Sequence, residues 1–526
     1  MSYFRRLNTG SYSVPAPAMV PNNGGGMGFK VDPWVQLDRF LILGSENGTY
    51  YVSERKLTDM NLTLVKGLLD TDGKRVVNAV ADVLQNRRAY KRTVPNYVLA
   101  LAASHEDEFV RAYALERAPR LLNTGTDLFQ FIEAVNHLRG WGKGLKRSVS
   151  SWYTGRDVDN LAYQLSKYKS RENWTHRDVF RLIHIKPDNA ELNALVKWSV
   201  KGYDGLTSRE INRLPATIVA AEALKGETDI NRAVKLIRDN RLVREVVPTE
   251  MLNSPKVWEA LLEDMPMTAM LRNLGKMTNV GLIGPFSQAS TKILGNLSEV
   301  GIQKAKVHPV QILLAMRTYA QGRGLKGSLS WSPDQRIVSR LDEAFYWAFR
   351  NVEKTSKNVL LGVDMSSSMT SPISGLPISS AEAAAAMALV IANSAPNYHI
   401  VGFAHNVRNL PIHPGMRLDQ VAQIVQDRNW GSTRCSAAME YAIKNRLPVD
   451  AFGIFTDNET NSDYNLPPHQ TVEKYRQMTG KKNAKLFVVA TTSTNISIAN
   501  PNDPNMLDVA GFDADAPRVI MDFIGQ

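Results

Sequence analysis

The sequence predicts a multidomain protein, with an all-α helical-repeat module in residues 28–357 followed by a doubly wound α/β domain in residues 358–526. Up to residue 349, apolar side chains recur every three or four residues, which is the spacing of amphipathic helices. After residue 358, short apolar runs alternate with helical stretches, which is typical of a mostly parallel sheet covered by helices. A chain of 526 residues is also longer than one ordinary domain.

The residues before the helical module have the composition of a flexible tail. Pro15, Pro17 and Pro21 and the glycines at 24–26 stand among few large apolar residues. Such a segment buries little apolar surface. We therefore expect residues 1–27 to form a flexible tail.

The helices of the first module are expected to pack in pairs. Apolar periodicity, interrupted by short breaks rich in Gly, Pro, Asn and Asp, predicts helices at Asn61–Leu84, Asn96–Ala103, Glu108–Leu122 and Thr126–Leu138. Helices of this length joined by short links indicate a solenoid of stacked helical pairs, although no strict sequence period is visible.

In the second domain the predicted strands are Val359–Asp364, His399–Phe403, Ala451–Thr456, Lys485–Ala490 and Val519–Phe523. The helices expected between them are Ala381–Ser394, Leu418–Arg428, Ser436–Arg446 and Thr471–Met478. In such sheets ligands bind beyond the carboxyl ends of the strands, near the point where the strand order reverses.

Oxygen-bearing side chains gather where these strands are predicted to end. Asp364 ends the first strand, with Ser366 and Ser368 close behind it, and Thr433 and Asp457 stand in two later loops. Carboxylate and hydroxyl oxygens suit a hard divalent ion, so the five residues are predicted to bind one ion, Mg²⁺ by preference. Their order resembles the metal-ion-dependent adhesion site of von Willebrand factor A domains. In the alternative interpretation the serines are turn residues and the aspartate caps a helix.

The net charge of +12 is unevenly distributed. Residues 358–526 contain 12 Lys and Arg against 15 Asp and Glu, which leaves 51 against 36 for the first 357 residues. The first part therefore carries +15 and the second −3. A basic helical module predicts a polyanionic partner, whereas the second domain gives no such indication.

The cellular setting is expected to be the cytoplasm. The single cysteine, Cys435, allows no intrachain disulfide, which fits a reducing compartment. No secretory signal is visible, and the longest strongly apolar run, Ala383–Ala392, is too short to span a bilayer. We expect a monomer without membrane contact.

Three consecutive predicted helices carry clustered cations. In Trp141–Tyr153 the apolar residues Leu145, Val149 and Trp152 share a face, and the cations lie opposite it. Leu161–Arg171 is predicted to be a second helix, and the third begins at Thr175, whose spacing to Asp178 is that of a capping box. The cations of the three helices are Lys143, Lys146, Arg147, Lys167, Lys169, Arg171, Arg177, Arg181, His184 and Lys186.

Several cations on successive helices could contact several phosphates, so we predict RNA binding. A solvated surface face is the alternative for the set, and a packed or capping role is the alternative for His184.

Several long motifs resemble the Ro autoantigen family, in which a TROVE module precedes a von Willebrand A domain. They are Leu41–Tyr51 (LILGSENGTYY), Glu263–Met277 (EDMPMTAMLRNLGKM), His308-Pro309, Gly322–Gly327 (GRGLKG) and Phe455–Thr460 (FTDNET). The resemblance covers nearly the whole chain from residue 29. It implies a ring of HEAT-like repeats closed by the A domain. Y RNA is then expected on the outer basic surface, and single-stranded ends of misfolded or maturing RNA in a central hole.

The resemblance also implies roles for individual residues. Lys167, Arg171 and His184 align with the Y RNA surface, and Arg272 and Lys276, within the second motif, are candidate RNA contacts. Asp364, Ser366, Ser368, Thr433 and Asp457 align with the metal site. Bacterial relatives are associated with exoribonucleases, which makes such an enzyme an expected partner. The chain departs from the family pattern in the tail before residue 28 and at Arg434, where many relatives carry an acidic residue.

No catalytic pattern accompanies these motifs. An aspartyl-phosphate enzyme requires a carboxylate where Ser366 stands, and the sequence lacks a P-loop motif. Two aspartates among neutral ligands are too few for a two-metal nuclease. We therefore expect an RNA-binding scaffold that is not an enzyme. The alternative is a metal-dependent protein-adhesion module that binds an acidic ligand and is supported by the helical half.

Overall fold

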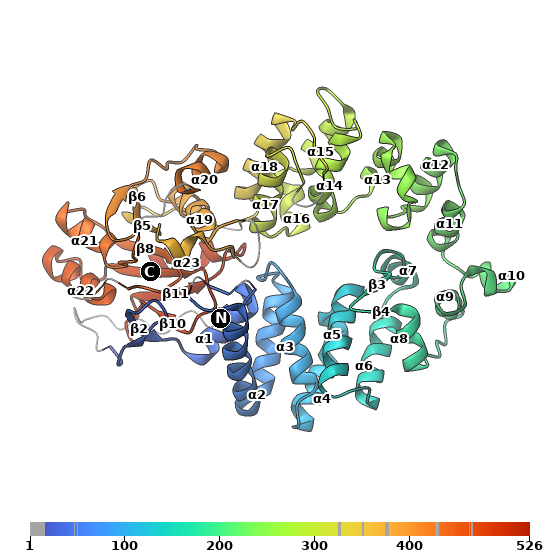
Figure 1. The fold of residues 1–526 in the computed structure, drawn as a ribbon, viewed down its shortest axis with the longest axis horizontal. Coiled ribbons are helices and arrows are strands. Elements are labelled where there is room, and N and C mark those ends of the chain that lie inside the picture. The colour runs from blue at the N-terminus through green and yellow to red at the C-terminus, as the bar shows by residue number, and fades with distance from the viewer. Residues whose placement is uncertain are drawn as a thin grey trace.

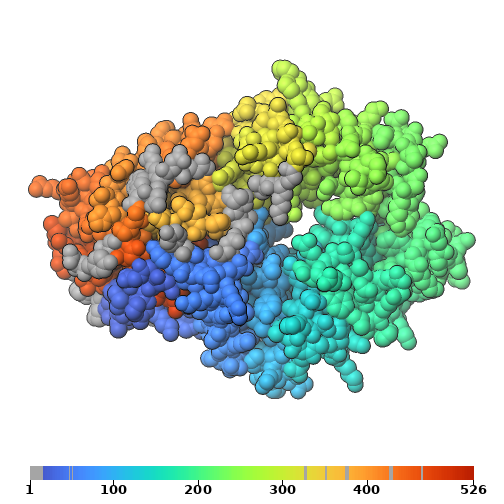
Figure 2. All heavy atoms as spheres, viewed as in Figure 1, coloured from blue at the N-terminus to red at the C-terminus, as the bar shows by residue number. Residues whose placement is uncertain are grey.

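The structure is a computed structural model that describes residues 16–46, 48–49, 51–324, 328–349, 352–373, 378–426, 431–461, 463 and 466–526. Its helices form a curved array, and both ends of the array meet a sheet domain that contains the C-terminus (Figure 1). In the space-filling view an opening separates the cyan and teal helices from the green and yellow ones (Figure 2). The predicted order of a helical module followed by a doubly wound α/β domain is confirmed.

The first arc of the array buries one continuous apolar core. Polar caps set the helix starts, as at Thr175, which forms the predicted capping box with Asp178. Helix α7 lies toward the opening, and α6 and α8 lie away from it (Figure 1). The arc comprises α1 Pro33–Leu43, α2 Glu54–Gln85, α3 Thr93–Ala103, α4 Glu108–Leu121, α5 Gly125–Leu138, α6 Lys143–Thr154, α7 Val158–Lys167, α8 His176–Ile183 and α9 Ala190–Lys201.

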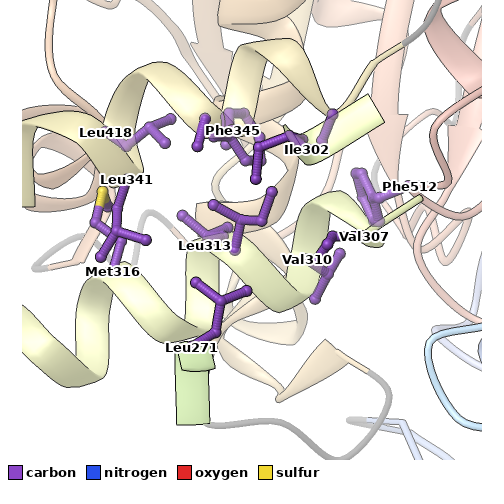
Figure 3. Packing of buried hydrophobic residues seen from close by; sticks show 14 of the residues in the cluster. Leu271, Ile302, Val307, Val310, Leu313, Met316, Leu341, Phe345, Leu418 and Phe512 are labelled. Carbon is purple, nitrogen blue, oxygen red and sulfur yellow. The ribbon is translucent and has the colours of Figure 1, made fainter. Parts of the chain in front are cut away.

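The second arc shares its apolar core with one face of the sheet domain. Leu313, Leu341 and Phe345 of the arc lie beside Leu418 and Phe512 of the sheet domain (Figure 3). The arc comprises the helices α10 Ser208–Ile211, α11 Ala216–Lys225, α12 Ile230–Asn240, α13 Pro255–Glu263, α14 Met267–Asn279, α15 Gln288–Asn296, α16 Glu299–Ala305, α17 Pro309–Ala320 and α18 Gln335–Trp347, and the 3₁₀ turns η1 Tyr203–Gly205, η2 Arg244–Val246 and η3 Thr249–Asn253.

The sheet domain contains a sheet in the order β11-β9-β8-β5-β6-β7, and all neighbouring strands are parallel except β6 and β7. Helices α19, α20 and α23 pack on one face, and α21 and α22 on the other. The strands are β5 Val359–Asp364, β6 Tyr398–Phe403, β7 Val407–Asn409, β8 Ala451–Thr456, β9 Lys485–Ala490 and β11 Met506–Ala510, and the helices are α19 Ser380–Ser394, α20 Leu418–Gln426, α21 Ala437–Lys444, α22 Pro468–Thr479 and α23 Ala516–Gly525.

Two predicted elements are wrong. The predicted strand Val519–Phe523 lies within α23, whose buried residues Ile520, Phe523 and Ile524 have helical spacing. The predicted helix Leu161–Arg171 ends at Lys167, and the two-residue strands β3 Ser170–Arg171 and β4 Trp174–Thr175 then form a hairpin. Glu172 and Asn173 have positive φ angles of 50° and 62°, as a two-residue hairpin turn requires.

The flexible tail predicted for residues 1–27 is wrong for residues 20–27. Val20–Pro21 (β1) pairs with Met27–Lys30 (β2), and β2 pairs with Ile496–Ser497 (β10) of the sheet domain. Residues 1–15 lie outside the described part of the chain. The N-terminal segment therefore belongs structurally to the sheet domain, although it precedes the helices.

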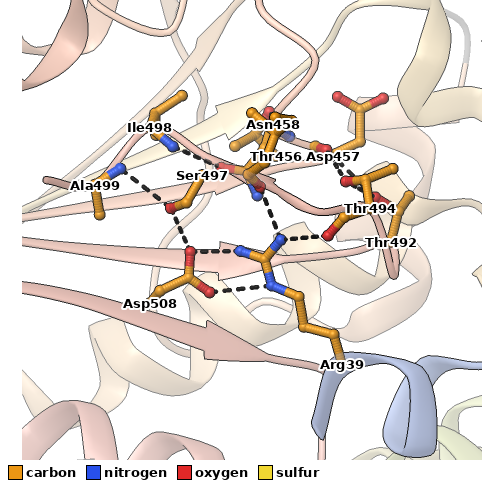
Figure 4. A network of polar contacts seen from close by, with 11 residues as sticks. Arg39, Thr456, Asp457, Asn458, Thr492, Thr494, Ser497, Ile498, Ala499 and Asp508 are labelled. Atoms are coloured by element: carbon orange, nitrogen blue, oxygen red, sulfur yellow. Dashed lines mark hydrogen bonds and ion pairs between the residues drawn. The ribbon is translucent and has the colours of Figure 1, made fainter. Parts of the chain in front are cut away.

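Buried ion pairs join the first arc to the sheet domain. Arg39 of α1 is fully buried and pairs with Asp508 of β11, and its Nη1 donates to the carbonyl oxygens of Thr494 and Ile496 at 2.8 Å (Figure 4). Arg88, after α2, pairs with Asp513 at 3.2 Å. Because these contacts involve the start of the array, the sheet domain closes the helical array into a ring.

Candidate metal centre and RNA-binding surface

The five predicted metal ligands lie together at the carboxyl edge of the sheet. Asp364 is the last residue of β5, and Asp457 directly follows β8, the neighbouring strand. Ser366 and Ser368 belong to the turn after β5, and Thr433 lies in the loop before α21. All five side chains are buried, with at most 2% of their surface exposed. The alternative interpretation, in which Asp364 caps a helix, is wrong because this residue ends a central strand.

Hydrogen bonds order the two carboxylates and the two serines. The backbone N–H of Ser366 donates to Asp364 Oδ1 at 2.9 Å, and Thr456 Oγ1 donates to Asp364 Oδ2 at 2.6 Å. The hydroxyl oxygens of Ser366 and Ser368 are 3.0 Å apart, and Ser368 also hydrogen-bonds to Asp457. The site is therefore preorganised by β5 and β8, which hold its ligands in fixed positions.

Contacts between loops bring Thr433 to the same site. Its backbone N–H donates to Asn461 Oδ1 at 2.8 Å, and its carbonyl oxygen accepts from the backbone N–H of Asn461 at 3.0 Å. Its hydroxyl, in contrast, is buried without a hydrogen-bond partner among the described residues. A buried hydroxyl without a partner costs free energy, so this oxygen is available to a ligand.

The electrostatics of the site favour a cation. Burial, together with the negative charge of Asp457, raises the pKa of Asp364 to about 7. Burial also raises the pKa of Asp457. Keeping two neighbouring carboxylates ionised in a buried position costs free energy unless a positive charge lies beside them. Across the described residues, no three His, Cys, Asp or Glu side chains converge as metal ligands, so two carboxylates and three hydroxyls form the donor set. This donor set fits a single Mg²⁺ ion.

Two residues near the site were singled out from the sequence for other reasons. Arg434 pairs with Glu440 at 3.1 Å, so part of its charge is neutralised within the domain. Cys435 is buried beside Thr456, with its Sγ 3.8 Å from Thr456 Oγ1, and burial raises the pKa of its thiol. It is therefore a packed residue.

Sequence reasoning missed the contribution of the N-terminal segment. Glu459, two residues after Asp457, is buried and accepts hydrogen bonds from Asn23 N at 2.7 Å, Asn23 Nδ2 at 2.8 Å and Gly24 N at 3.1 Å. A Cβ atom at Gly26 would lie 2.0 Å from the carbonyl oxygen of Thr460. The glycine run that suggested flexibility is instead what this close backbone contact requires.

Tyr51 of the helical module also reaches the metal site. Asn461 Nδ2 donates to the Tyr51 hydroxyl at 3.3 Å, and Asn461 in turn binds the Thr433 backbone. Burial, with the negative charges of Asp457 and Asp364, raises the pKa of Tyr51 to about 12. The metal site is thus bounded on one side by a residue outside the sheet domain.

The predicted basic residues of the first arc are spread over α6, α7, the β3–β4 hairpin and α8. On α6, Leu145, Val149 and Trp152 are buried as predicted, whereas Lys143 and Arg147 are exposed. Within the described part of the chain, no side chain of the set forms an ion pair with a carboxylate. The set is Lys143, Lys146, Arg147, Lys167, Lys169, Arg171, Arg177, Arg181, His184 and Lys186.

Local geometry distinguishes the members of this set. Lys167 Nζ donates to the Tyr163 hydroxyl at 2.6 Å, and Lys169 Nζ donates to the carbonyl oxygen of Glu245 in η2 at 2.8 Å. Arg171 is exposed on the hairpin rather than on a helix. His184 is an exposed residue with a φ angle of 50° at the end of α8, so the packed role is wrong for it and the capping position is correct. Arg272 and Lys276 lie apart from the set, on α14 of the second arc.

Known domains and proteins are similar to this chain over nearly its whole length. Residues 20–210 and 211–357 match the TROVE domain, and residues 358–524 match the Ro60 vWA domain. The RNA-binding protein RO60 of Caenorhabditis elegans is 33% identical, over 96% of this chain and 90% of that protein. The RNA-binding protein RO60 of Deinococcus radiodurans is 36% identical, over 96% of this chain and 95% of that protein.

A solved structure has a similar fold. The crystal structure of the Deinococcus radiodurans RO (RSR) protein matches with a TM-score of 0.70 and 34% sequence identity, over 94% of this chain and 99% of that chain. The match includes both the helical arcs and the sheet domain, because it covers nearly all residues of both chains.

Proposed function

The chain belongs to the Ro60 family, in which a TROVE domain precedes a von Willebrand factor A domain, and from this premise we propose that it is an RNA-binding scaffold rather than an enzyme. The scaffold binds a small structured RNA of the Y type on the outer surface of the first arc. It also accepts single-stranded ends of misfolded or maturing RNA in the opening of the ring. An exoribonuclease that processes those ends is the proposed protein partner, in the cytoplasm.

The observation that carries this proposal is the gathering of nine lysines and arginines, together with His184, between Lys143 and Lys186, none of which forms an ion pair with a carboxylate among the described residues. Many other lysines and arginines in that part of the chain also form no ion pair, so it is the clustering of these residues on adjoining elements that favours a polyanionic partner. Arg171, Arg177 and Arg181 are exposed on the adjoining hairpin and α8. Cations in this arrangement bind phosphates and release the counterions condensed on RNA.

A search of the helices in the described part of the chain finds none with the length and apolar character of a membrane span.

For the sheet domain we propose a single Mg²⁺ bound by Asp364, Ser366, Ser368, Thr433 and Asp457. The two carboxylates neutralise the ion, and the three hydroxyls complete its oxygen shell without adding charge. The ion would supply an electrophilic position for an oxygen of an external acidic ligand. Because the neutral ligands outnumber the charged ones, the ion would keep enough positive charge to attract such a ligand. The site is therefore suited to binding a partner rather than to cleaving one.

The test of RNA binding compares two variants that remove the same amount of charge. In the double variant Lys167→Ala/Arg171→Ala, RNA affinity should fall several-fold, and the slope of log K against log salt should flatten by about 1–2. The control, Lys292→Ala/Lys304→Ala, removes two exposed cations from the second arc. Fluorescence anisotropy with a labelled structured RNA at several salt concentrations measures both. Equal losses in the two variants would show that net charge, not this surface, holds the RNA.

A second experiment separates RNA binding from metal-dependent adhesion. Asp364→Ala should abolish Mg²⁺ binding in calorimetry and leave RNA affinity largely unchanged, because the basic set lies on other elements. RNA affinity that disappears with a chelator and does not respond to salt would favour the adhesion function instead.

A further inference from the structure

A cavity of about 410 Å³ lies in the second arc, between α13, α14, α17 and the turn that follows α17. This volume is within the range, roughly 300–1,000 Å³, of sites that hold small organic groups. The cavity belongs neither to the metal site nor to the basic set of the first arc. Its lining combines aromatic rings, cations and the uncharged polar side chains of Asn273, Gln311 and Thr318.

Aromatic residues from different segments form the apolar part of the lining. Tyr319 of α17 stacks on Trp331 with an interplanar angle of 17° and a centroid distance of 6.2 Å. The indole N–H groups already have partners, since Trp331 Nε1 donates to Tyr319 O and Trp258 Nε1 donates to Leu252 O. The rings therefore offer the cavity their faces and edges rather than hydrogen-bond donors. A flat aromatic ligand suits such a lining.

Three cations in the lining have no carboxylate partner among the described residues: Arg244, Arg272 and Lys276. Lys276 Nζ donates to Asn253 Oδ1 at 2.9 Å, and Arg244 lies over the Trp258 ring at 5.9 Å. Arg244 and Arg272 are exposed.

Other arginines of the same arc differ in this respect. Arg238 pairs with Glu263, Arg336 with Asp334, and Arg340 with Glu343. Arg209, Arg213 and Arg232 of the arc, however, also form no ion pair within the described residues. What distinguishes the three cations of the lining is their position around one aromatic cavity, which favours an anionic group beside an aromatic one.

Both arcs contribute to the lining of the cavity. Tyr90, which belongs to the turn between α2 and α3 in the first arc, lies in the lining beside the residues of α13, α14 and α17. Residues of both arcs therefore meet at this cavity.

One polar atom in the lining lacks a partner. Thr318 Oγ1 is buried and makes no hydrogen bond within the described part of the chain. A ligand with hydrogen-bonding edges would satisfy this hydroxyl, whereas a purely apolar ligand would leave it unsatisfied.

We propose that this cavity binds one unpaired nucleobase of a single-stranded RNA, with Arg244, Arg272 and Lys276 contacting the flanking phosphates. The inference rests on the proposed RNA-binding function and adds a defined subsite to it. Stacking on aromatic side chains combined with cationic contacts to the backbone is how proteins hold single strands. A base in a duplex is paired and stacked within it and does not enter, so the subsite selects single-stranded segments.

Two variants test the subsite. Leu314→Trp fills the cavity from α17, and Arg272→Gln removes an exposed cation without breaking an ion pair. Each should weaken binding of a fluorescein-labelled short oligouridylate by at least about fivefold, and leave binding of a blunt RNA hairpin unchanged. The matched control Arg232→Gln removes an exposed arginine of α12 outside the lining and should leave both affinities unchanged. Circular dichroism and thermal unfolding establish that each variant folds.

The site of contact is tested by photocrosslinking to the wild-type protein. An oligouridylate that carries one 5-iodouracil should crosslink to peptides that contain Trp331, Trp258 or Tyr90. Crosslinks confined to other peptides would overturn the proposal. So would oligouridylate affinities of the two variants equal to that of the control. Absence of RNA binding by the wild-type protein would instead overturn the proposed function, so the two failures are distinguishable.

Discussion

Among the five proposed metal ligands, Thr433 is the one whose side-chain oxygen has the fewest hydrogen bonds to the described part of the protein. Its hydroxyl is buried and has no hydrogen-bond partner in the part of the chain that the structure describes, whereas the other hydroxyls of the site bond to each other or to a carboxylate. We expect Thr433→Val, which has the same shape, to raise the free energy of unfolding of the metal-free protein by about 1 kcal/mol, because an unsatisfied hydroxyl disappears. The same variant should weaken Mg²⁺ binding by at least about tenfold.

Thermal unfolding with and without Mg²⁺ measures both effects. Thr433→Ser restores the hydroxyl and should restore the response to Mg²⁺, which controls for changes in packing. A stabilisation by Mg²⁺ in Thr433→Val as large as in the wild-type protein would contradict a ligand role for this hydroxyl.

At the residue scale the sequence predicts well which polar side chains meet at a strand end, and it predicts contacts between distant segments poorly. Asp364, Ser366 and Ser368 are close in sequence, so a single strand end brings them together. Glu459 and Tyr51 carry no such signal, because their roles depend on segments more than 400 residues apart, as the Asn23 and Asn461 contacts illustrate. The capping box of Thr175 and Asp178 predicts where α8 begins, nine and six residues before His184, but it predicts neither the left-handed backbone of His184 nor its exposure.

Among the elements, the N-terminal hairpin of β1 and β2 has the least expected role. Its turn contacts the loop after β8 that supplies Asp457. We expect Gly26→Ala to lower the free energy of unfolding by about 1–3 kcal/mol, since the new Cβ would lie 2.0 Å from Thr460 O. Because the displaced loop carries a metal ligand, Mg²⁺ affinity should fall as well.

Isothermal titration with Mg²⁺ and chemical unfolding test this role of the hairpin. Gly67→Ala is the matched control, because a Cβ at Gly67 of α2 meets no atom within 4 Å and this glycine has no positive φ angle. Wild-type Mg²⁺ affinity in Gly26→Ala would show that the hairpin does not position the loop.

Elements with conflicting local signals explain the errors of prediction. β11 was missed because Asp508 interrupts a short apolar run. Its carboxylate pairs with Arg39 from α1 and accepts a hydrogen bond from the hydroxyl of Ser497, and neither residue is its neighbour in the sequence. Helix α7 ends four residues before Arg171, the predicted end. The sequence did not indicate this end, because the hairpin turn is formed by Glu172 and Asn173 and contains no glycine. Strands β5, β8 and β9 were correct since each is a fully buried apolar run.

At the scale of the whole molecule, the helical ring and the sheet domain form one cooperative structure. The core of the second arc continues into the sheet domain at Leu418 and Phe512. Arg39, fully buried, joins the first arc to β11. We expect Arg39→Met to lower the free energy of unfolding by roughly 3–5 kcal/mol, because it leaves the Asp508 carboxylate without its ion-pair partner. Calorimetry should show one unfolding transition at a lower temperature. Two separate transitions would show that the domains unfold independently.

A half-buried histidine, His308, lies where the ring closes, and we expect it to make stability depend on pH. His308, at the start of α17, lies against the turn after α2, where its Nε2–H donates to Arg88 O at 3.2 Å and its Nδ1 accepts from Val310 N at 3.3 Å. Both ring nitrogens are therefore used by the neutral imidazole. Burial lowers the pKa of His308 below 6.5, and the negative charge of Asp513 offsets part of this effect. The charge of Arg88, which pairs with Asp513, faces the same junction.

A histidine whose pKa is lower in the folded state binds fewer protons there than in the unfolded chain. Stability is therefore fully present above a pH of about 6.5, the pKa of an unfolded histidine, and is lost as the pH falls toward the lower pKa of the folded state. We expect His308→Gln to be less stable than the wild-type protein at neutral pH, where the imidazole contacts are intact. The difference should shrink as the pH falls below about 6.5, because only the wild-type protein loses this contribution. Unfolding free energies across that range measure it, and a constant difference would mean that His308 does not titrate at the junction that closes the ring.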